Sequence, residues 1–150
     1  MRRRVVQGLL AMTLLLVSGD AAAKLMSVAV TRANFRDGPS LAHEVLFTGE
    51  RYFPVKVLER QRGWAKIVDF EGERAWVAAR LLCQRDTVAV SVQRGNVRAG
   101  PGLAHGVIAK VEYGEVYRIA ERQGRWLRLA TTDDTIGWVR NDLTWGDEDG

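Results

Sequence analysis

The sequence has little of what disulfide-rich, metal-dependent and membrane-anchored proteins need. Its 150 residues include one cysteine, two histidines and three prolines, and no apolar run after residue 23 is long enough to span a bilayer. The lone Cys83 excludes an internal disulfide, and neither histidine has a second ligand nearby at metal-binding spacing. With 47% hydrophobic and 27% charged residues, the composition is that of a folded globular protein and excludes a disordered chain. We expect no metal and no cofactor.

The first 23 residues have the pattern of a secretory signal peptide. Three arginines at positions 2–4 precede an apolar stretch over residues 5–17, and small residues follow up to an Ala-x-Ala site at 21–23. We therefore expect residues 1–23 to be cleaved on export and the rest to act in the periplasm or outside the cell, without stable membrane insertion. Residues 24–150 keep 19 basic and 17 acidic side chains, a net charge of +2 with no cluster of Lys and Arg. Nucleic acid is therefore not an expected partner.

The most informative feature is an internal duplication. Shifted by 62 residues, the chain matches itself without a gap, and 19 of the 57 positions in residues 27–83 are identical to their counterparts. Chance gives about three or four identities over such a length, and the period is longer than that of solenoid repeats. We expect two small domains, residues 24–83 and 86–146. The link over residues 82–87 has no Gly, Pro or Ser, which predicts a fixed relation between them.

Each copy has the pattern of β-structure. Segments such as 53–58 and 63–68 alternate apolar with polar residues or carry β-branched residues, and turn signals separate them at 37–40, 61–63 and 71–72. Five or six short strands in about 60 residues favour a small, strongly bent barrel, because closure limits exposed sheet edges. The predicted fold class is all-β, with two tandem small barrels.

The duplicated residues resemble the bacterial SH3-like (SH3b-type) domain family. The resemblance lies in Asn-x-Arg-x-Gly-Pro, a tryptophan at a hairpin, and a closing Trp-Val-x-x-x-Leu. These occur as Asn34, Arg36, Gly38, Pro39, Trp64, Trp76 and Leu81 in the first copy, and as Asn96, Arg98, Gly100, Pro101, Trp126, Trp138 and Leu143 in the second. The resemblance implies non-catalytic modules of the cell envelope, which are often attached to, or work beside, enzymes that cut peptidoglycan.

Part of this motif has a structural reading. Gly permits a sharp turn, Pro fixes φ just after it, and Asn holds a neighbouring backbone group through its side chain. We assign this role to Asn34, Gly38, Pro39 and Trp76, and to Asn96, Gly100, Pro101 and Trp138.

The candidate ligand contacts are Trp64, Trp126, Arg36 and Arg98. If Leu127 and Leu129 face the core, Trp126 and Arg128 share the opposite face of their strand. A tryptophan beside a cation suits contact with a sugar ring or an extended peptide. The other interpretation is that these tryptophans cover the barrel rim or the interface between the copies. A groove for proline-rich peptides is not expected, because the last turns at 78–81 and 140–143 contain neither Pro nor Tyr.

No catalytic constellation can be assembled from the two histidines and Cys83. The acidic groups at 69–73, at 133–134 and in the tail at 147–149 are predicted to be solvated turns and a terminus. Cys83 corresponds to Trp145 of the second copy, which favours a packing position and leaves an intermolecular disulfide open. A cell-wall hydrolase is therefore disfavoured.

Two hypotheses for function remain. The leading one is a binding module that engages peptidoglycan (peptide or glycan) or an envelope protein. The alternative is a structural protein–protein adaptor in the periplasm without a small ligand. Residues 24–83 carry a net charge of +3 and residues 84–150 a net charge of −1, so the first copy is predicted to be the better suited to an anionic surface.

Overall fold

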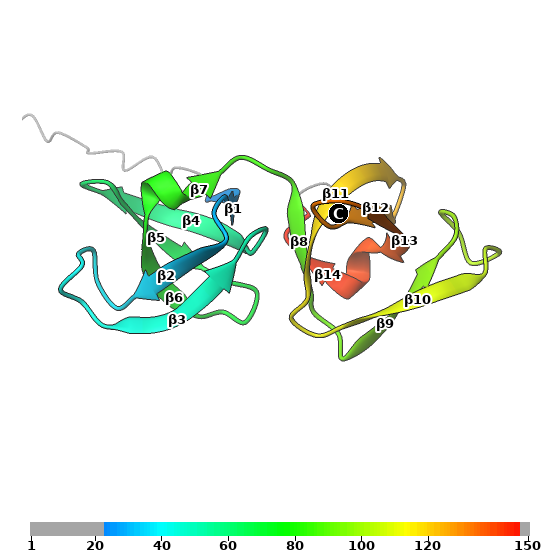
Figure 1. The fold of residues 1–150 in the computed structure, drawn as a ribbon, viewed down its shortest axis with the longest axis horizontal. Helices are drawn as coiled ribbons and strands as arrows, with labels where there is room; N and C mark the ends of the chain where they lie inside the picture. Colours follow the sequence, from blue (N-terminus) through cyan, green and yellow to red (C-terminus); the bar gives the residue numbers. More distant parts are fainter. Residues whose placement is uncertain (1–22, 148–150) are drawn as a thin grey trace, which may run out of the picture.

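The computed structural model describes residues 23–147, and within them the chain folds into two curled sheets lying side by side (Figure 1). The first sheet comprises β1 (Lys24–Val28), β2 (Arg32–Arg36), β3 (Val45–Glu50), β4 (Pro54–Gln61), β5 (Trp64–Val68), β6 (Arg74–Ala78) and β7 (Leu82–Cys83), with a 3-10 helix η1 (Ala79–Leu81) before β7. The predicted signal peptide lies, but for its last residue, outside the described residues.

The second sheet repeats the first element by element. It comprises β8 (Thr87–Val90), β9 (Arg94–Arg98), β10 (Val107–Glu112), β11 (Val116–Gln123), β12 (Trp126–Ala130), β13 (Thr135–Arg140) and β14 (Thr144–Trp145), with η2 (Asn141–Leu143) before β14. The strand orders are β3-β2-β6-β5-β4-β1-β7 and β10-β9-β13-β12-β11-β8-β14, and the strand pairs are antiparallel. The prediction of an all-β chain with two tandem small β units is confirmed. Each has seven strands instead of five or six, because a two-residue strand after the 3-10 turn pairs back onto β1 or β8.

Each sheet, called here the first and the second barrel, encloses its own core. Equivalent positions fill the two cores, but the large and small side chains are exchanged: the first barrel has Phe35 and Ala65 where the second has Val97 and Leu127. All four side chains are fully buried. Protein interiors are close-packed, so an exchange of this kind keeps the filled volume similar while the two sequences diverge.

The alternation along β12 sets the orientation of the predicted site. Leu127 and Leu129 are buried, whereas Trp126 and Arg128 are half-buried on the other side of the strand. The same pattern holds along β5, where Trp64 and Lys66 lie opposite buried neighbours. The tryptophan and the cation therefore share one face in each barrel, as the sequence predicts.

The two barrels touch each other directly. Only residues 84–86 separate β7 from β8. Across the junction, the hydroxyls of Tyr52 and Thr132 lie 3.1 Å apart, and the rings of Phe70 and Tyr113 have centroids 5.4 Å apart. The ammonium of Lys56 lies 5.9 Å from the centroid of the Trp145 ring. These contacts join the two barrels, and the fixed relation expected from the link stays a prediction.

Tyr52 occupies a strained position at this junction. Its φ is 76°, in the left-handed region, whereas its counterpart in the second barrel is Gly114 with φ 83°. A bulky residue rarely adopts this conformation, and it persists only where surrounding contacts hold it. Besides the Thr132 bond, the guanidinium carbon of Arg85 lies 5.6 Å from the Tyr52 ring centroid. The backbone of Tyr52 is therefore strained, and its side chain makes contacts where the two barrels join.

Candidate functional site

Arg36 and Arg98 hold the loops that follow β2 and β9. In the second barrel, Nη1 of Arg98 donates hydrogen bonds to the carbonyl oxygens of Leu103 (3.3 Å) and His105 (2.8 Å). Arg36 makes the same two bonds at the same distances to the carbonyls of residues 41 and 43. A guanidinium has five N–H donors, so fastening the loop leaves others for a ligand.

The glycine of each Gly-Pro step is needed for close packing. Neither Gly38 nor Gly100 has a positive φ. A Cβ at Gly38 would lie 2.2 Å from the ring of His43, and one at Gly100 would lie 2.5 Å from the ring of His105. The histidine ring packed against it is therefore one physical reason for glycine at each position, beside the bend that the chain makes there. This arrangement also assigns both histidines a packing role within their loops.

Apolar side chains point into solvent from these loops and from the strands after them, a feature that the sequence analysis missed. Leu41 is 77% exposed and its counterpart Leu103 is 68% exposed. The same holds for two further equivalent pairs, Val45 with Val107 and Leu46 with Ile108. The signal was present in the duplication, because these positions stay apolar in both copies. Exposed apolar residues at matched positions are typical of an interaction surface.

A groove of about 270 Å³ brings the predicted site residues of the second barrel together. Trp126, Arg98 and Leu103 all line it. Its rim carries Arg140 and Asp142, whose side chains form an ion pair of 2.5 Å. An indole, an aliphatic side chain and guanidinium groups around one groove suit a ligand with flat apolar faces and polar edges, such as a sugar or an extended peptide.

Asn96 also lines this groove, and its side chain acts differently from the expectation. Its Oδ1 accepts a hydrogen bond from the ammonium of Lys110 on the neighbouring strand, where the sequence analysis expects a backbone partner. The first barrel has the equivalent Trp64, Arg36 and Leu41. It has Ala78 and Arg80 at the positions of Arg140 and Asp142, so the ion pair has no equivalent there and the charge of the two positions is more positive.

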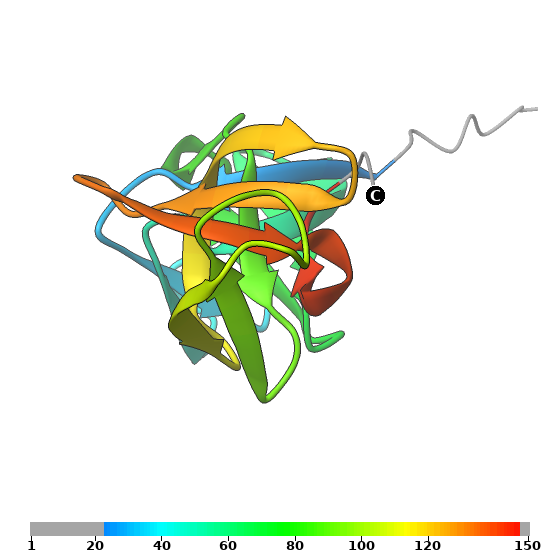
Figure 2. The same ribbon diagram turned by 90° about the vertical axis from the view of Figure 1, so that its right-hand side faces the viewer.

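The β2–β3 loop of the first barrel and the β9–β10 loop of the second lie at opposite ends of the molecule (Figure 1). Figure 2 turns the second barrel, with its β9–β10 loop, toward the viewer. A small ligand bound at one loop therefore does not reach the other. Equivalent residues such as Arg36 and Arg98 are not brought into a single site.

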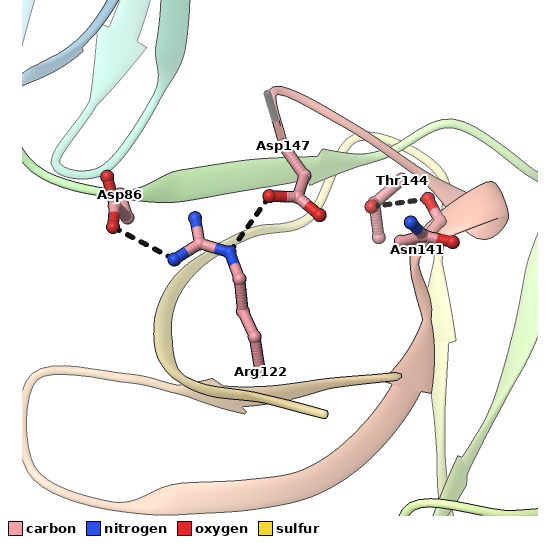
Figure 3. A network of polar contacts seen from close by, with 5 residues as sticks. All are labelled: Asp86, Arg122, Asn141, Thr144 and Asp147. Atoms are coloured by element: carbon pink, nitrogen blue, oxygen red, sulfur yellow. Dashed lines mark hydrogen bonds and ion pairs between the residues drawn. The ribbon is translucent and has the colours of Figure 1, made fainter. Parts of the chain in front are cut away.

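A network of polar side chains lies where the barrels join, away from the groove. Arg122 of β11 donates from Nε to Asp147 (3.0 Å) and from Nη1 to Asp86 (3.1 Å), as Figure 3 shows. Burial opposes the charged form of Arg122, but the hydrogen bonds with Asp147 and Asp86 outweigh it, so the pKa of Arg122 lies above its ordinary value. Nearby, Thr144 donates a 2.8 Å hydrogen bond to the carbonyl of Asn141 and closes the η2 turn (Figure 3). The link and the C-terminal segment are thereby fastened to the second barrel.

Two of the acidic groups predicted to be solvated are in fact enclosed. The side chain of Asp147 is 6% exposed because it pairs with Arg122. Asp69 is 5% exposed, and its Oδ1 accepts 2.9 Å hydrogen bonds from the backbone N–H groups of Glu71 and Glu73. A carboxylate in a turn can fold inward to cap backbone donors, which composition does not reveal.

The remaining features that bear on function are the Cys83 thiol, possible metal ligands and possible membrane-spanning helices. The thiol of Cys83 is half-buried and lies 3.6 Å from the hydroxyl of Ser27. Between residues 23 and 147, no three His, Cys, Asp or Glu side chains are placed to hold a metal ion. No helix in that same stretch has the length and apolar character to cross a membrane.

Two sequence models of one family match the chain. Residues 29–83 and residues 93–144 each match a model described as "Bacterial SH3 domain", and together they cover more than two thirds of the chain. The chain belongs to the bacterial SH3 domain family, with two domains in tandem. Domains of this kind are typical of exported or cell-wall-associated proteins.

Relatives match only in part. A stretch of 50 residues is 38% identical to the Bacillus subtilis (strain 168) protein named "Putative N-acetylmuramoyl-L-alanine amidase YrvJ"; it is 33% of this chain and 10% of that protein. The chain therefore spans about a tenth of this relative's length.

The comparison with solved structures gives partial matches of low sequence identity, all with TM-scores below 0.5. One is an NlpC/P60 family protein from Bacillus cereus ATCC 10987, at 12% identity and a TM-score of 0.39, over 81% of this chain and 55% of that one. Another is NlpC1 from Trichomonas vaginalis, at 15% identity and a TM-score of 0.37, over 87% of this chain and 48% of that one. A third is the endolysin LysPBC5 CBD, at 16% identity and a TM-score of 0.33, over 82% of this chain and 93% of that one.

Proposed function

We propose that this protein is a non-catalytic module of the cell envelope that binds peptidoglycan through the groove around Trp126. The observation that carries the proposal is the meeting of Trp126, Arg98 and Leu103 in one groove of a bacterial SH3 domain. The partial relative adds support, because its name concerns N-acetylmuramoyl-L-alanine, the junction of glycan and peptide in peptidoglycan. Export by residues 1–23 would place the protein where this polymer is.

The groove has the physical properties that such a ligand requires. The half-buried indole of Trp126 offers a flat apolar face to a sugar ring or a peptide. Leu103 adds aliphatic surface that is otherwise exposed to water at an energetic cost. The guanidinium groups of Arg98 and Arg140 supply donors for carbonyl, carboxylate or hydroxyl oxygens.

The first barrel is proposed to add a second contact to the same polymer. It repeats Trp64, Arg36 and Leu41 at the equivalent positions and carries the net charge of +3. Since the two loops face opposite ways, one molecule can engage two sites on a repeating polymer, and two linked contacts raise the overall affinity.

Co-sedimentation with purified peptidoglycan sacculi tests the proposal. The wild-type protein should pellet with sacculi, Trp126→Ala should lose most of this binding, and Trp64→Ala should lose less. Circular dichroism of each variant must match the wild type before binding is compared. If the wild type stays in the supernatant, or if Trp126→Ala pellets like the wild type, the proposal is wrong.

The exposed apolar residues favour one alternative, a protein–protein adaptor. Leu46 and Ile108 lie on the strands after the loops and are exposed at matched positions without lining the groove. An adaptor would show no binding to sacculi. It would instead capture an envelope protein, and the double variant Leu46→Ser/Ile108→Ser would lose that capture.

A further inference from the structure

The β2–β3 loop of the first barrel, residues 37–44, differs in charge from its counterpart in the second barrel, residues 99–106. With histidine counted as neutral, it carries a formal charge of −2, from Asp37 and Glu44. The second loop has alanine and glycine at these two positions and no charged residue. Both acidic residues are exposed. Of the two loops, the one on the first barrel, called here the acidic loop, is therefore the one that presents negative charge to solvent.

The acidic loop is held in one shape by its own hydrogen bonds. Oδ1 of Asp37 accepts a 3.0 Å bond from the backbone N–H of Glu44, and the hydroxyl of Ser40 lies 2.7 Å from Nδ1 of His43. The second loop has alanine and glycine in place of the aspartate and the serine, so it lacks both bonds. Between these bonds Leu41 is 77% exposed. An apolar side chain on a preformed loop suits binding, because little conformational freedom is lost when it docks.

The groove around Trp126 has the opposite charge. Arg94, Arg98 and Arg140 line it. One carboxylate, that of Asp142, lines it too, which leaves a formal charge of +2 from three cations and one anion. Asp142 pairs with Arg140, whereas Arg94 is exposed and forms no ion pair within residues 23–147. The loop beside the groove has no carboxylate, so it does not offset this positive charge.

The acidic loop and the groove around Trp126 are complementary, and they lie at opposite ends of the molecule (Figure 1). They therefore meet between two molecules and not within one. Opposite charges favour a contact between the loop of one copy and the groove of another, whereas two acidic loops or two basic grooves repel each other. Such a contact is heterologous: it leaves one loop and one groove unused, so further copies can add.

We propose that the acidic loop of one copy docks in the groove around Trp126 of a second copy, so that the protein associates head to tail. Leu41 enters the groove and contacts Leu103 and the indole. Asp37 and Glu44 face the arginines that line it. The docked loop covers residues that are proposed to bind peptidoglycan, so the two occupants compete. The inference does not rest on the proposed function, because self-association needs no peptidoglycan.

Sedimentation velocity of the whole purified protein, without peptidoglycan, tests the proposal. At low salt the wild type should form larger species as its concentration rises, and high salt should return it to single copies, because the contact is small and partly electrostatic. Glu44→Lys and Arg94→Glu should each weaken association at least about tenfold. Both side chains are exposed, so circular dichroism should match the wild type. Glu59→Lys, the same charge change at an exposed position of β4, is the matched control and should associate like the wild type.

A mixture of the two variants separates a head-to-tail contact from a symmetric one. Glu44→Lys keeps an unchanged groove and Arg94→Glu keeps an unchanged acidic loop, so the mixture should form complexes that neither variant forms alone. A wild type that stays a single copy at every concentration, either variant associating like the wild type, or a mixture without complexes would overturn the proposal. A wild type that pellets with sacculi but never self-associates would overturn this inference and leave the proposed function standing.

Discussion

The guanidinium of Arg98 crosses the loop after β9 and donates a 2.8 Å hydrogen bond to the carbonyl oxygen of His105. In the first barrel Arg36 makes the same bond to His43, also at 2.8 Å. The two copies differ at most positions, yet this contact is the same in both. Since Leu103 sits inside the loop that Arg98 holds, the arginine shapes the groove whether or not it touches the ligand itself.

Replacing Arg98 by lysine should loosen this loop. Both bonds come from one nitrogen, Nη1, whose N–H directions are fixed by the planar guanidinium, and lysine keeps the charge without this fixed geometry. Because both bonds are exposed, we expect the free energy of unfolding to fall by only about 1 kcal/mol. Hydrogen exchange of the amides at 99–106 should quicken more clearly. Arg125→Lys, at an exposed hairpin position, is the control; equal exchange rates in the two variants would contradict a loop-holding role.

Gly137 should be far less tolerant of alanine than Gly124. Both have positive φ, 125° and 55° respectively. A Cβ at Gly137 would lie 2.8 Å from the carbonyl oxygen of Arg98, whereas one at Gly124 meets nothing within 4 Å. We expect Gly137→Ala to lower the free energy of unfolding by about 1–3 kcal/mol, and Gly124→Ala by about 1 kcal/mol. Urea denaturation measures both; a larger loss in Gly124→Ala would refute the steric account.

The Tyr52–Thr132 hydroxyl pair should couple the two barrels. Tyr52→Phe removes the 3.1 Å contact but keeps the ring beneath Arg85. We expect Tyr52→Phe and Thr132→Val each to lower the free energy of unfolding by about 0.5–1.5 kcal/mol. In the double variant the losses should not add, because both remove one bond. Full additivity in this double-mutant cycle would show that the hydroxyls do not interact.

Tyr117 should make stability fall at alkaline pH. Burial, and the 2.6 Å hydrogen bond that its hydroxyl donates to Glu115, raise the pKa of Tyr117 above the ordinary value of 10.0. Above pH 10 the unfolded chain releases this proton while the folded chain still holds it, so the free energy of unfolding decreases as pH rises. Below pH 10 the contribution is fully present. Tyr117→Phe should flatten the decrease above pH 10; an unchanged pH profile would contradict this.

The general architecture was predictable because its signals are local or duplicated. The 62-residue repeat predicts two equivalent units, and the alternation around Leu127 and Leu129 predicts the face on which Trp126 lies. The reason for glycine at position 100 was not predictable. It depends on a histidine ring that returns to the same place five residues later, and only the folded loop brings the two together.

The polar centre between the barrels was also beyond sequence reasoning. Asp86, Arg122 and Asp147 come from the link, a strand and the C-terminal segment, and no spacing connects them. Asp147 belongs to an acidic tail whose composition indicates solvation. The structure instead pairs it with Arg122, because the strand that precedes it ends beside β8.

The central claim is that peptidoglycan contacts the groove around Trp126. The most direct test is NMR of the ¹⁵N-labelled protein titrated with soluble peptidoglycan fragments. The account predicts saturable shifts of the Trp126 indole N–H and of the backbone amides of Asn96 and Leu103, with the buried Trp138 indole little changed. Shifts confined to other residues, or none at all, would contradict it.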